Sequence, residues 1–355
     1  MIEPFRDRIQ AATAAGTPLR IVGGASKDWY GGPLLGDPLD TRGHSGIVDY
    51  EPTELVVTVR CGTPLVELEA LLRGQRQMLA FEPPRFGAAS TIGGVVASGL
   101  SGPRRATAGA VRDFLLGAQL MNGKGELLNF GGQVMKNVAG YDVSRLLAGS
   151  MGVLGLITQV SLKVLPLPLV ETTLRFELEE IAALAKINEW GGQPLPVSAT
   201  CWHDGVLTVR LSGAEPAVAA AIRRLGGEAV ADGPAFWESL RDQTHAFFDT
   251  DTLWRLALPP SASALILGGV QLIEWGGGQR WLKSPRAGAA DIRRAVAAAG
   301  GHATLYRATD KRAGAFHAQS PAIARIHQRL QAAFDPAGIF NRGRLYREPH
   351  ANQPR

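Results

Sequence analysis

The spacing of apolar residues over the first half of the chain alternates between that of helices and that of strands. Apolar residues three and four positions apart predict a helix from Phe5 to Ala15, which Gly16 ends. Aliphatic and β-branched runs bounded by turn residues predict short strands. These strands are expected at 19–22, 55–59, 115–121 and 156–165.

A second helix is predicted directly after the strand at 55–59. Thr63 is expected at its N-cap and Pro64 at its first helical position, because these residue types favour those positions. The buried face of this helix would consist of Leu65, Leu68, Leu71 and Leu72.

The pattern changes after Pro166 and Pro168, which indicate the end of a domain. Beyond them an α+β pattern predicts a sheet with helices on one face. Near the end, a helix is expected at 321–334, and the turn-rich stretch at 335–343 is more like the first part of the chain than the middle. The candidates in the middle are 172–176, 179–190, 206–211, 214–225 and 254–258. We therefore predict three segments, residues 1–168, 169–318 and 319–355, with the last one returning to the first.

The composition is that of a globular protein that can bury a core, with 45% hydrophobic and 19% charged residues in 355. The net charge of +5 comes from arginines spread along the chain, so no basic stripe for nucleic acid is expected.

Cys61 and Cys201 have neither metal-ligand nor disulfide-like spacing, which favours a reducing compartment. The N-terminus lacks the features of a signal peptide, and no apolar run approaches the roughly 20 residues of a membrane helix. These features predict a cytoplasmic protein without a membrane span, and they leave peripheral attachment at the inner face of the membrane open.

The glycine content favours loops that surround a ligand, because 43 glycines are well above the average usage of about 7%. The predicted strand at 19–22 runs into Gly23-Gly24-Ala25-Ser26, where uncovered N–H groups can hold an anion such as a pyrophosphate. A Rossmann turn is excluded because residues 27–33 cannot continue as a long helix. Taken alone, this loop is also compatible with an ordinary turn.

Two further glycine segments follow. Hydroxyls and bare backbone alternate over 90–99, which suits contact with phosphates and a flat ring, and Gly140-Tyr141-Asp142 leads into a run with glycines at 149, 152 and 155. Each segment alone is also compatible with close packing, but their order along the chain favours a ligand. Arg104-Arg105 and Arg112-Asp113 add charges that either neutralise phosphates or lie on a solvated surface.

The order of these segments resembles the FAD-linked oxidase fold of the vanillyl-alcohol oxidase and p-cresol methylhydroxylase (PCMH) family. The signatures lie at 19–26, at Thr91-Ile92-Gly93-Gly94, at 140–158 and in the closing segment at 335–344. Further stretches are similar to the FAD-binding E subunits of bacterial glycolate oxidases, namely 46–55, 100–105, 130–142 and 280–283. The resemblance implies an α+β fold with a two-subdomain PCMH-type FAD-binding domain, a smaller α+β cap domain and a C-terminal segment that returns to the FAD domain.

The resemblance also implies which residues bind FAD. The pyrophosphate is expected on Gly23, Gly24, Ala25 and Ser26. Thr91, Gly93, Gly94 and Ala97 would line the flavin and ribityl region, and Gly149, Gly152, Gly155 and Ile157 would complete the pocket. The predicted cofactor-binding set further includes Val22, Ser90, Arg104, Asp113 and Asn341.

The flavin is expected to be non-covalent. Family members with covalent flavin place a histidine in the first glycine loop, where this chain has Ala25, and no cysteine falls in the segment before Thr91. Met151 stands where relatives commonly have an acidic residue.

The implied reaction is the oxidation of a small 2-hydroxyacid, glycolate, to the 2-oxoacid glyoxylate. Such a reaction needs a base for the hydroxyl proton and a cation for the carboxylate. Arg255, Arg280 and Lys283 are the candidates for the cation, and His302 is the weakest candidate for the base. The implied partners are a sister flavin subunit and an iron–sulfur subunit.

Catalytic relatives resemble one another in a histidine pair that usually works with a metal. None of the seven histidines here is paired at metal-ligand spacing, so no metal is predicted. This favours a flavin that relays electrons or completes the complex. The alternatives are a self-sufficient FAD-dependent D-2-hydroxyacid dehydrogenase and a non-enzymatic scaffold subunit, and the intact glycine loops argue against the scaffold.

Overall fold

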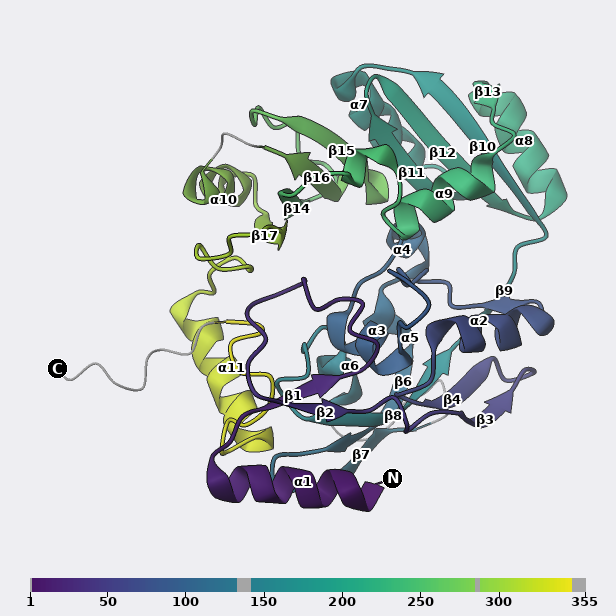
Figure 1. Cartoon of the computed structure of the whole chain (residues 1–355). Coiled ribbons are helices and arrows are strands. Elements are labelled where there is room, and N and C mark those ends of the chain that lie inside the picture. The colour runs from purple at the N-terminus through teal and green to yellow at the C-terminus, as the bar shows by residue number, and fades with distance from the viewer. Residues whose placement is uncertain (1, 133–141, 285–287, 347–355) are drawn as a thin grey trace.

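The computed structural model describes residues 2–132, 142–284 and 288–346, which form two parts built around separate antiparallel sheets (Figure 1). The first part holds the N-terminal half of the chain and the long helix near its C-terminus, and the second part lies above it in the view. Gly140 and Tyr141, from the third glycine segment, lie outside the described residues. No helix of the described ranges is long and apolar enough to cross a membrane.

The first part contains a five-stranded sheet with the central strand β8. In spatial order its strands are β3 (Ile47–Glu51), β4 (Val56–Arg60), β8 (Leu156–Lys163), β6 (Leu115–Met121) and β7 (Leu127–Gly131). Every neighbouring pair is antiparallel. Val160 of β8 packs in one cluster with Leu68 and Val96 of two helices that follow β4 in the chain, so the sheet and these helices share a core. The strands predicted at 55–59, 115–121 and 156–165 are thereby confirmed, with small differences at their ends.

The helices of the first part are short apart from those at its two chain ends. They are α1 (Ile2–Ala15), α2 (Leu65–Gly74), α3 (Ile92–Ser98), α4 (Arg105–Ala108), α5 (Val111–Phe114), α6 (Ser144–Leu147) and α11 (Pro321–Phe334). The predicted helices at 5–15 and 321–334 are confirmed.

The predicted start of α2 is wrong by one position. The N-cap is Pro64, and the hydroxyl of Thr63 accepts a hydrogen bond from the N–H of Gly46 instead of capping the helix. Leu71 is 37% exposed, so the buried face of this helix consists of Leu65, Leu68 and Leu72. Thr63 joins α2 to the loop before β3, which is a tertiary contact that the capping preference does not reveal.

The C-terminal segment returns to the first strand. β1 (Leu19–Val22) pairs in parallel with β2 (Asp37–Asp40). Leu19 also donates a hydrogen bond of 2.7 Å to the carbonyl of Ile339 and accepts one of 2.9 Å from the N–H of Asn341. Phe340 is buried in a cluster with Ile9 of α1. A small sheet of β5 (Gln77–Met78) and β9 (Leu165–Pro166) completes the first part.

The second part is an eight-stranded antiparallel sheet. In spatial order the strands are β13 (Glu228–Ala229), β10 (Val170–Glu177), β12 (Val206–Gly213), β11 (Val197–His203), β15 (Val270–Glu274), β16 (Gln279–Lys283), β14 (Leu253–Ala257) and β17 (His302–Arg307). Its helical segments are α7 (Glu180–Gly191), α8 (Glu215–Leu225), α9 (Gly233–Arg241), η1 (Ala246–Phe248), η2 (Trp275–Gly277) and α10 (Ala289–Ala298).

Both faces of this sheet are covered, so the prediction of helices on one face is wrong. Successive residues of a strand point to opposite faces, and Leu272 and Ile273 of β15 accordingly belong to different clusters. Ile273 packs with residues of α7 and α8, whereas Leu272 packs with Trp237 of α9 and with Met151 of the first part. The second face therefore lies against α9 and the loops of the first part.

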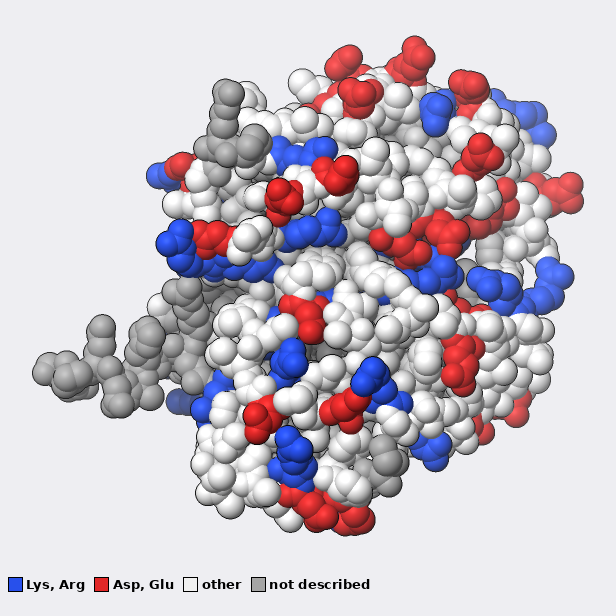
Figure 2. Space-filling model, viewed as in Figure 1, with Lys and Arg blue, Asp and Glu red and all other residues white. Residues whose placement is uncertain are grey.

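Ion pairs join the two parts. Arg104 pairs with Glu82 and with Glu171, and Arg210 of β12 pairs with Glu82 at 2.9 Å. Acidic and basic side chains meet along this junction in the space-filling view (Figure 2). Because Arg104 and Arg210 are both mostly buried, these pairs help to fix the position of the two sheets relative to each other.

Candidate FAD site

The first glycine turn packs directly on the segment before α3. A Cβ on Gly24 would lie 1.5 Å from the carbonyl oxygen of Ala89, and one on Gly23 would lie 2.4 Å from the Thr91 hydroxyl. Ala25 has φ +53°, in the left-handed region. Only glycine allows this approach of two backbones, and the resulting turn presents unshielded N–H groups to a ligand.

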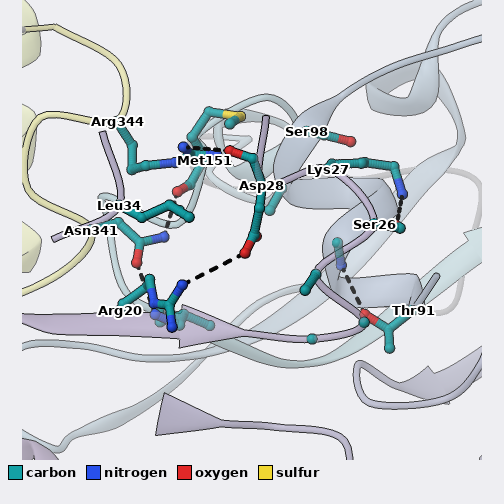
Figure 3. Close-up of a pocket in the computed structure, with 16 residues that line it drawn as sticks. Arg20, Ser26, Lys27, Asp28, Leu34, Thr91, Ser98, Met151, Asn341 and Arg344 are labelled. Atoms are coloured by element: carbon teal, nitrogen blue, oxygen red, sulfur yellow. Dashed lines mark hydrogen bonds and ion pairs between the residues drawn. The ribbon is translucent and has the colours of Figure 1, made fainter. Parts of the chain in front are cut away.

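A buried lysine forms one wall of this pocket (Figure 3). The Lys27 ammonium donates a hydrogen bond of 3.3 Å to the Ser26 hydroxyl. It also donates one of 2.7 Å to the Ser90 hydroxyl. Burial lowers the pKa of Lys27 to about 8, although the negative charge of Asp242 acts in the opposite direction. A cation held between two hydroxyls beside a glycine turn suits a phosphate group.

Residues near the C-terminus form the opposite wall (Figure 3). The amide of Asn341 accepts a hydrogen bond from the N–H of Ile21 (2.8 Å) and donates one to the carbonyl of Met151 (2.7 Å). The Arg344 guanidinium donates to the carbonyls of Asp28 (3.1 Å) and Gly32 (2.5 Å), which fixes the loop after the glycine turn. The pocket is therefore assembled from both ends of the chain.

Eight of the predicted cofactor-binding residues line this pocket. They are Gly23, Gly24, Ala25, Ser26, Thr91, Gly94, Ala97 and Asn341. The pocket is open at Gly94 in α3, because a Cβ there would touch only the Thr91 hydroxyl, at 3.4 Å. The structure adds residues that the sequence interpretation missed: Arg20, Ile21, Lys27, Asp28, Leu34, Ser98, Met151 and Arg344. Lys27 directly follows the glycine turn and could have been inferred from that position, but nothing local marks Arg344.

Other predicted residues support the pocket from behind. Ser90 binds Lys27, and Val22 accepts a hydrogen bond from the N–H of Thr41 (2.9 Å). A Cβ on Gly93 would lie 2.9 Å from that of Cys61, and one on Gly152 would lie 2.5 Å from the Asn341 amide nitrogen. These glycines permit close packing beneath the site.

The remaining predicted residues lie elsewhere. Arg104 is engaged by Glu82 and Glu171 at the junction of the two parts, which its neighbours in sequence do not reveal. Asp113 accepts a hydrogen bond from the N–H of Ala110 at the start of α5 (2.8 Å). Ile157 lies in the core of the first sheet. Gly155 packs against the backbone of β6, while Gly149 lines a second cavity.

This second cavity, of about 440 Å³, lies between the two parts and meets the first pocket at Ser98, which lines both. The two cavities are therefore neighbours. The basic lining residues of the second cavity are Arg105, Arg112, Arg255, His302, His317 and His327. Among the described residues no aspartate or glutamate lines it. The cavity is consequently suited to an anionic ligand.

The structure separates the four predicted substrate residues. Arg255 and His302 line the cavity, but Arg280 and Lys283 do not. Arg280 is fully buried and donates hydrogen bonds to backbone carbonyls, including that of Ser263 (2.8 Å). Lys283 lies over the ring of Phe247, with 4.9 Å between its ammonium and the ring centroid. The sequence does not reveal this difference, because the side chains of Arg280 and Lys283 point to opposite faces of β16 and each is taken up by packing within the second part.

The histidines of the cavity are not arranged around a metal. Within the ranges 2–132, 142–284 and 288–346, no group of three or more His, Cys, Asp or Glu residues could hold an ion. Burial, together with the charges of Arg255 and His317, lowers the pKa of His302. A histidine in this state is neutral at physiological pH and can accept a proton.

The comparisons with known proteins agree with this geometry. A family model described as FAD binding domain matches residues 2–131. Alkyldihydroxyacetonephosphate synthase has the same fold, with a TM-score of 0.65 and 15% identity over 95% of this chain and 74% of its own. The chain is thus an FAD-dependent oxidoreductase with the α+β architecture of PCMH-type flavoproteins.

The relationship to one group is closer. The chain is 50% identical to glycolate oxidase subunit GlcE of Escherichia coli (strain K12), over 96% of both sequences. It is 33% identical to glycolate oxidase subunit GlcD of Bacillus subtilis (strain 168), over 39% of this chain and 30% of the relative. D-lactate dehydrogenase of Anaerostipes hadrus is 31% identical over 44% of this chain and 31% of its own length. The chain belongs to the glycolate oxidase subunit GlcE family.

Proposed function

We propose that this chain is the FAD-binding subunit of a complex that oxidises glycolate, a small 2-hydroxyacid, to glyoxylate. The observation that carries the proposal is the cavity beside the FAD pocket, which has basic residues and no described carboxylate. The family relationship supports it, because the relative at 50% identity is named as a glycolate oxidase subunit. In this proposal residues 1–168 form the FAD-binding domain, 169–318 the cap and 319–355 a segment that closes the FAD site.

The residues of the first pocket fit the parts of FAD. The turn at 23–26 and Lys27 would hold the pyrophosphate, and Thr91, Gly94 and Ala97 would lie along the ribityl chain. When bound, the flavin supplies a hydride acceptor. Ser98 lines both this pocket and the second cavity, so the proposed cofactor and substrate sites are neighbours.

The attachment of FAD is proposed to be non-covalent. Ala25 offers only a methyl group in the glycine turn, and a methyl group cannot bond to the flavin ring. Acid denaturation should therefore release all flavin into the supernatant. Yellow colour that stays with the precipitated protein would contradict this.

The second cavity provides groups for a hydroxyacid. Arg255 and Arg105 can pair with its carboxylate, and a neutral His302 can take the hydroxyl proton as hydride leaves the α-carbon. The carboxylate and the proton acceptor would thereby orient the substrate.

A second candidate role is that this flavin only relays electrons, with the substrate oxidised on a partner. The lack of a metal-binding group in the described part of the chain favours this role. The partners in either case are proposed to be a sister flavin subunit and an iron–sulfur subunit, in a cytoplasmic complex that can lie at the inner face of the membrane. The relatives' names, which call them subunits, support a multi-subunit complex.

One experiment separates these roles. The purified chain is loaded with FAD and mixed with glycolate under anaerobic conditions while the visible spectrum is recorded. Bleaching of the flavin bands would mean that this chain oxidises the substrate itself. Stable bands would favour the relay, and a chain that cannot be loaded with FAD would refute the flavin subunit altogether.

A further inference from the structure

Trp275 stands between the two parts of the molecule in an unusual backbone conformation. It follows β15 with φ +54°, in the left-handed region, and is 7% exposed. A bulky side chain rarely adopts this conformation, and such strain is kept where the surrounding structure requires it. Trp275 lines the second cavity, with its basic residues, on one side. On the other side it lines a separate, largely apolar cavity of about 480 Å³. Its ring is therefore a wall of the proposed substrate site.

Two arginines from different parts of the chain approach this ring. The guanidinium carbon of Arg105, in α4 of the first part, lies 4.4 Å from the ring centroid, and that of Arg255, in β14 of the second part, lies 5.4 Å from it. Both arginines line the cavity. The electron-rich face of an indole attracts such cations and offsets part of their mutual repulsion.

The ring itself is fixed. Its indole N–H donates a hydrogen bond of 3.0 Å to the carbonyl of Gly102, in the first part. The N–H of the next residue, Gly276, donates one of 3.0 Å to the Thr200 hydroxyl in β11. Trp275 is thus tied to both parts of the molecule, and the orientation of its ring depends on their relative position.

The guanidiniums of Arg105 and Arg255, by contrast, have N–H donors that no protein acceptor uses in the described part of the chain. Within the described part of the chain, neither Arg105 nor Arg255 forms a salt bridge or a side-chain hydrogen bond to a protein atom, unlike Arg104 and Arg280, which are fully engaged. A guanidinium has five N–H donors, which match the oxygens of a carboxylate in pairs. The uncommitted donors face a cavity that no described acidic residue lines.

We propose that Trp275 is a positioning residue that holds Arg105 and Arg255 as a two-guanidinium clamp for the carboxylate of a small hydroxyacid. The inference rests on the proposed function and assigns the residue that organises its substrate site. The clamp takes one arginine from each part. The carboxylate can therefore be bound by both arginines only when the two parts are packed so that both guanidiniums lie next to the Trp275 ring.

Oxalate is a suitable probe, because it is a small carboxylate without a hydrogen to transfer. Its binding to the FAD-loaded chain is followed by the change in the flavin spectrum. Trp275→Leu, which removes the aromatic face, should weaken oxalate binding about tenfold, whereas Trp275→Phe should stay within roughly threefold of the wild type.

Trp237→Leu is the matched control. Trp237 is also buried, also has an arginine over its ring (Arg210, 5.2 Å) and also donates an indole hydrogen bond (to Thr173, 2.9 Å), but it does not line the cavity. Its loss should lower stability without changing oxalate affinity. Equal losses in both Leu variants, or an unchanged affinity in Trp275→Leu, would overturn the clamp.

A second variant avoids the risk that Trp275→Leu fails to fold. Tetrafluorotryptophan introduced at position 275 keeps the shape and the N–H but withdraws electron density from the ring, so oxalate binding should still weaken. Unchanged affinity there would overturn the clamp. If the wild type binds FAD but no oxalate, the anion site of the proposed function fails as well, whereas a failure limited to the Trp275 variants refutes the clamp alone.

Discussion

The side-chain carbonyl of Asn341 accepts a 2.8 Å hydrogen bond from the backbone N–H of Ile21, although 320 positions separate the two residues. The same amide donates to the carbonyl of Met151 (2.7 Å), a residue with φ +54°. One side chain thereby joins β1, the third glycine segment and the C-terminal segment at the edge of the FAD pocket. The tie explains how a pocket made from distant segments keeps a defined shape.

Removing this tie should weaken both the fold and FAD binding. We expect Asn341→Ala to lower the free energy of unfolding by roughly 1–3 kcal/mol, because it leaves a donor and an acceptor without partners. Denaturant unfolding and FAD titration would measure the two effects. Gln328→Ala, on the exposed side of α11, is the control and should change neither. Wild-type FAD affinity in Asn341→Ala would argue against a role for the C-terminal segment in the site.

Substitutions at Gly94 test the pocket, because a loss of FAD can be measured separately from a loss of folding. A Cβ there meets only the Thr91 hydroxyl at 3.4 Å, so Gly94→Ala should fold and retain FAD. Gly94→Trp should fold but lose FAD, because its indole would occupy the space above α3. Flavin content per folded protein, with circular dichroism as the check on folding, measures this. Normal flavin content in a folded Gly94→Trp protein would refute the assignment of the pocket.

Lys27 should make FAD binding depend on pH. Its burial lowers the pKa to about 8 in the absence of ligand, and the nearby negative charge of Asp242 partly counters this. Below pH 8 the ammonium is charged and can pair with a pyrophosphate, so FAD affinity should fall as the pH rises through 8. Lys27→Met should weaken FAD binding at pH 7 by roughly ten- to hundredfold and flatten the pH profile. Titrations from neutral to alkaline pH would show this, with the exposed Lys124→Met as the control. A wild-type profile in Lys27→Met would exclude Lys27 as the pyrophosphate cation.

Glu274 should make the stability of the fold depend on pH, in a lower pH range than that in which Lys27 affects FAD binding. Burial raises its pKa from 4.5 to about 7, although Trp281 donates a hydrogen bond of 2.6 Å to the carboxylate. Between pH 4.5 and pH 7 this carboxyl is protonated in the folded protein but ionised in the unfolded chain. Its contribution to the free energy of unfolding is therefore fully present below pH 4.5 and is lost as the pH rises through 7. Glu274→Gln should therefore exceed the wild type in stability at pH 8, by roughly 1–3 kcal/mol, and match it near pH 5.

Thermal unfolding at the two pH values tests the Glu274 prediction. Glu177→Gln, at the exposed end of β10, is the control and should leave the difference between the two pH values unchanged. A Glu274→Gln protein that is less stable than the wild type at pH 8 would show that the buried carboxylate is needed in its charged form.

The sequence by itself determined the local elements and the cofactor. Helices at 5–15 and 321–334 and strands at 19–22 and 115–121 follow from apolar spacing, because that spacing must match the period of the element that buries it. Gly23 and Gly24 were identifiable from their place directly after the strand at 19–22, and the structure leaves no space for a side chain at either position, because a Cβ would meet the Thr91 hydroxyl or the Ala89 carbonyl. The Thr63 cap was predicted wrongly, since a long-range hydrogen bond to Gly46 outcompetes a local preference.

Only the tertiary structure decided which charges meet. Arg104 and Arg105 are adjacent, yet the first is held in ion pairs at the junction and the second faces the cavity with free donors. Arg255 joins Arg105 there, whereas Arg280 is buried among carbonyls. The sequence carries no signal for this, because the partners that an arginine side chain meets depend on how the strands and the two sheets pack. The proposed substrate site therefore depends on that packing, whereas the glycine turn follows from the local sequence.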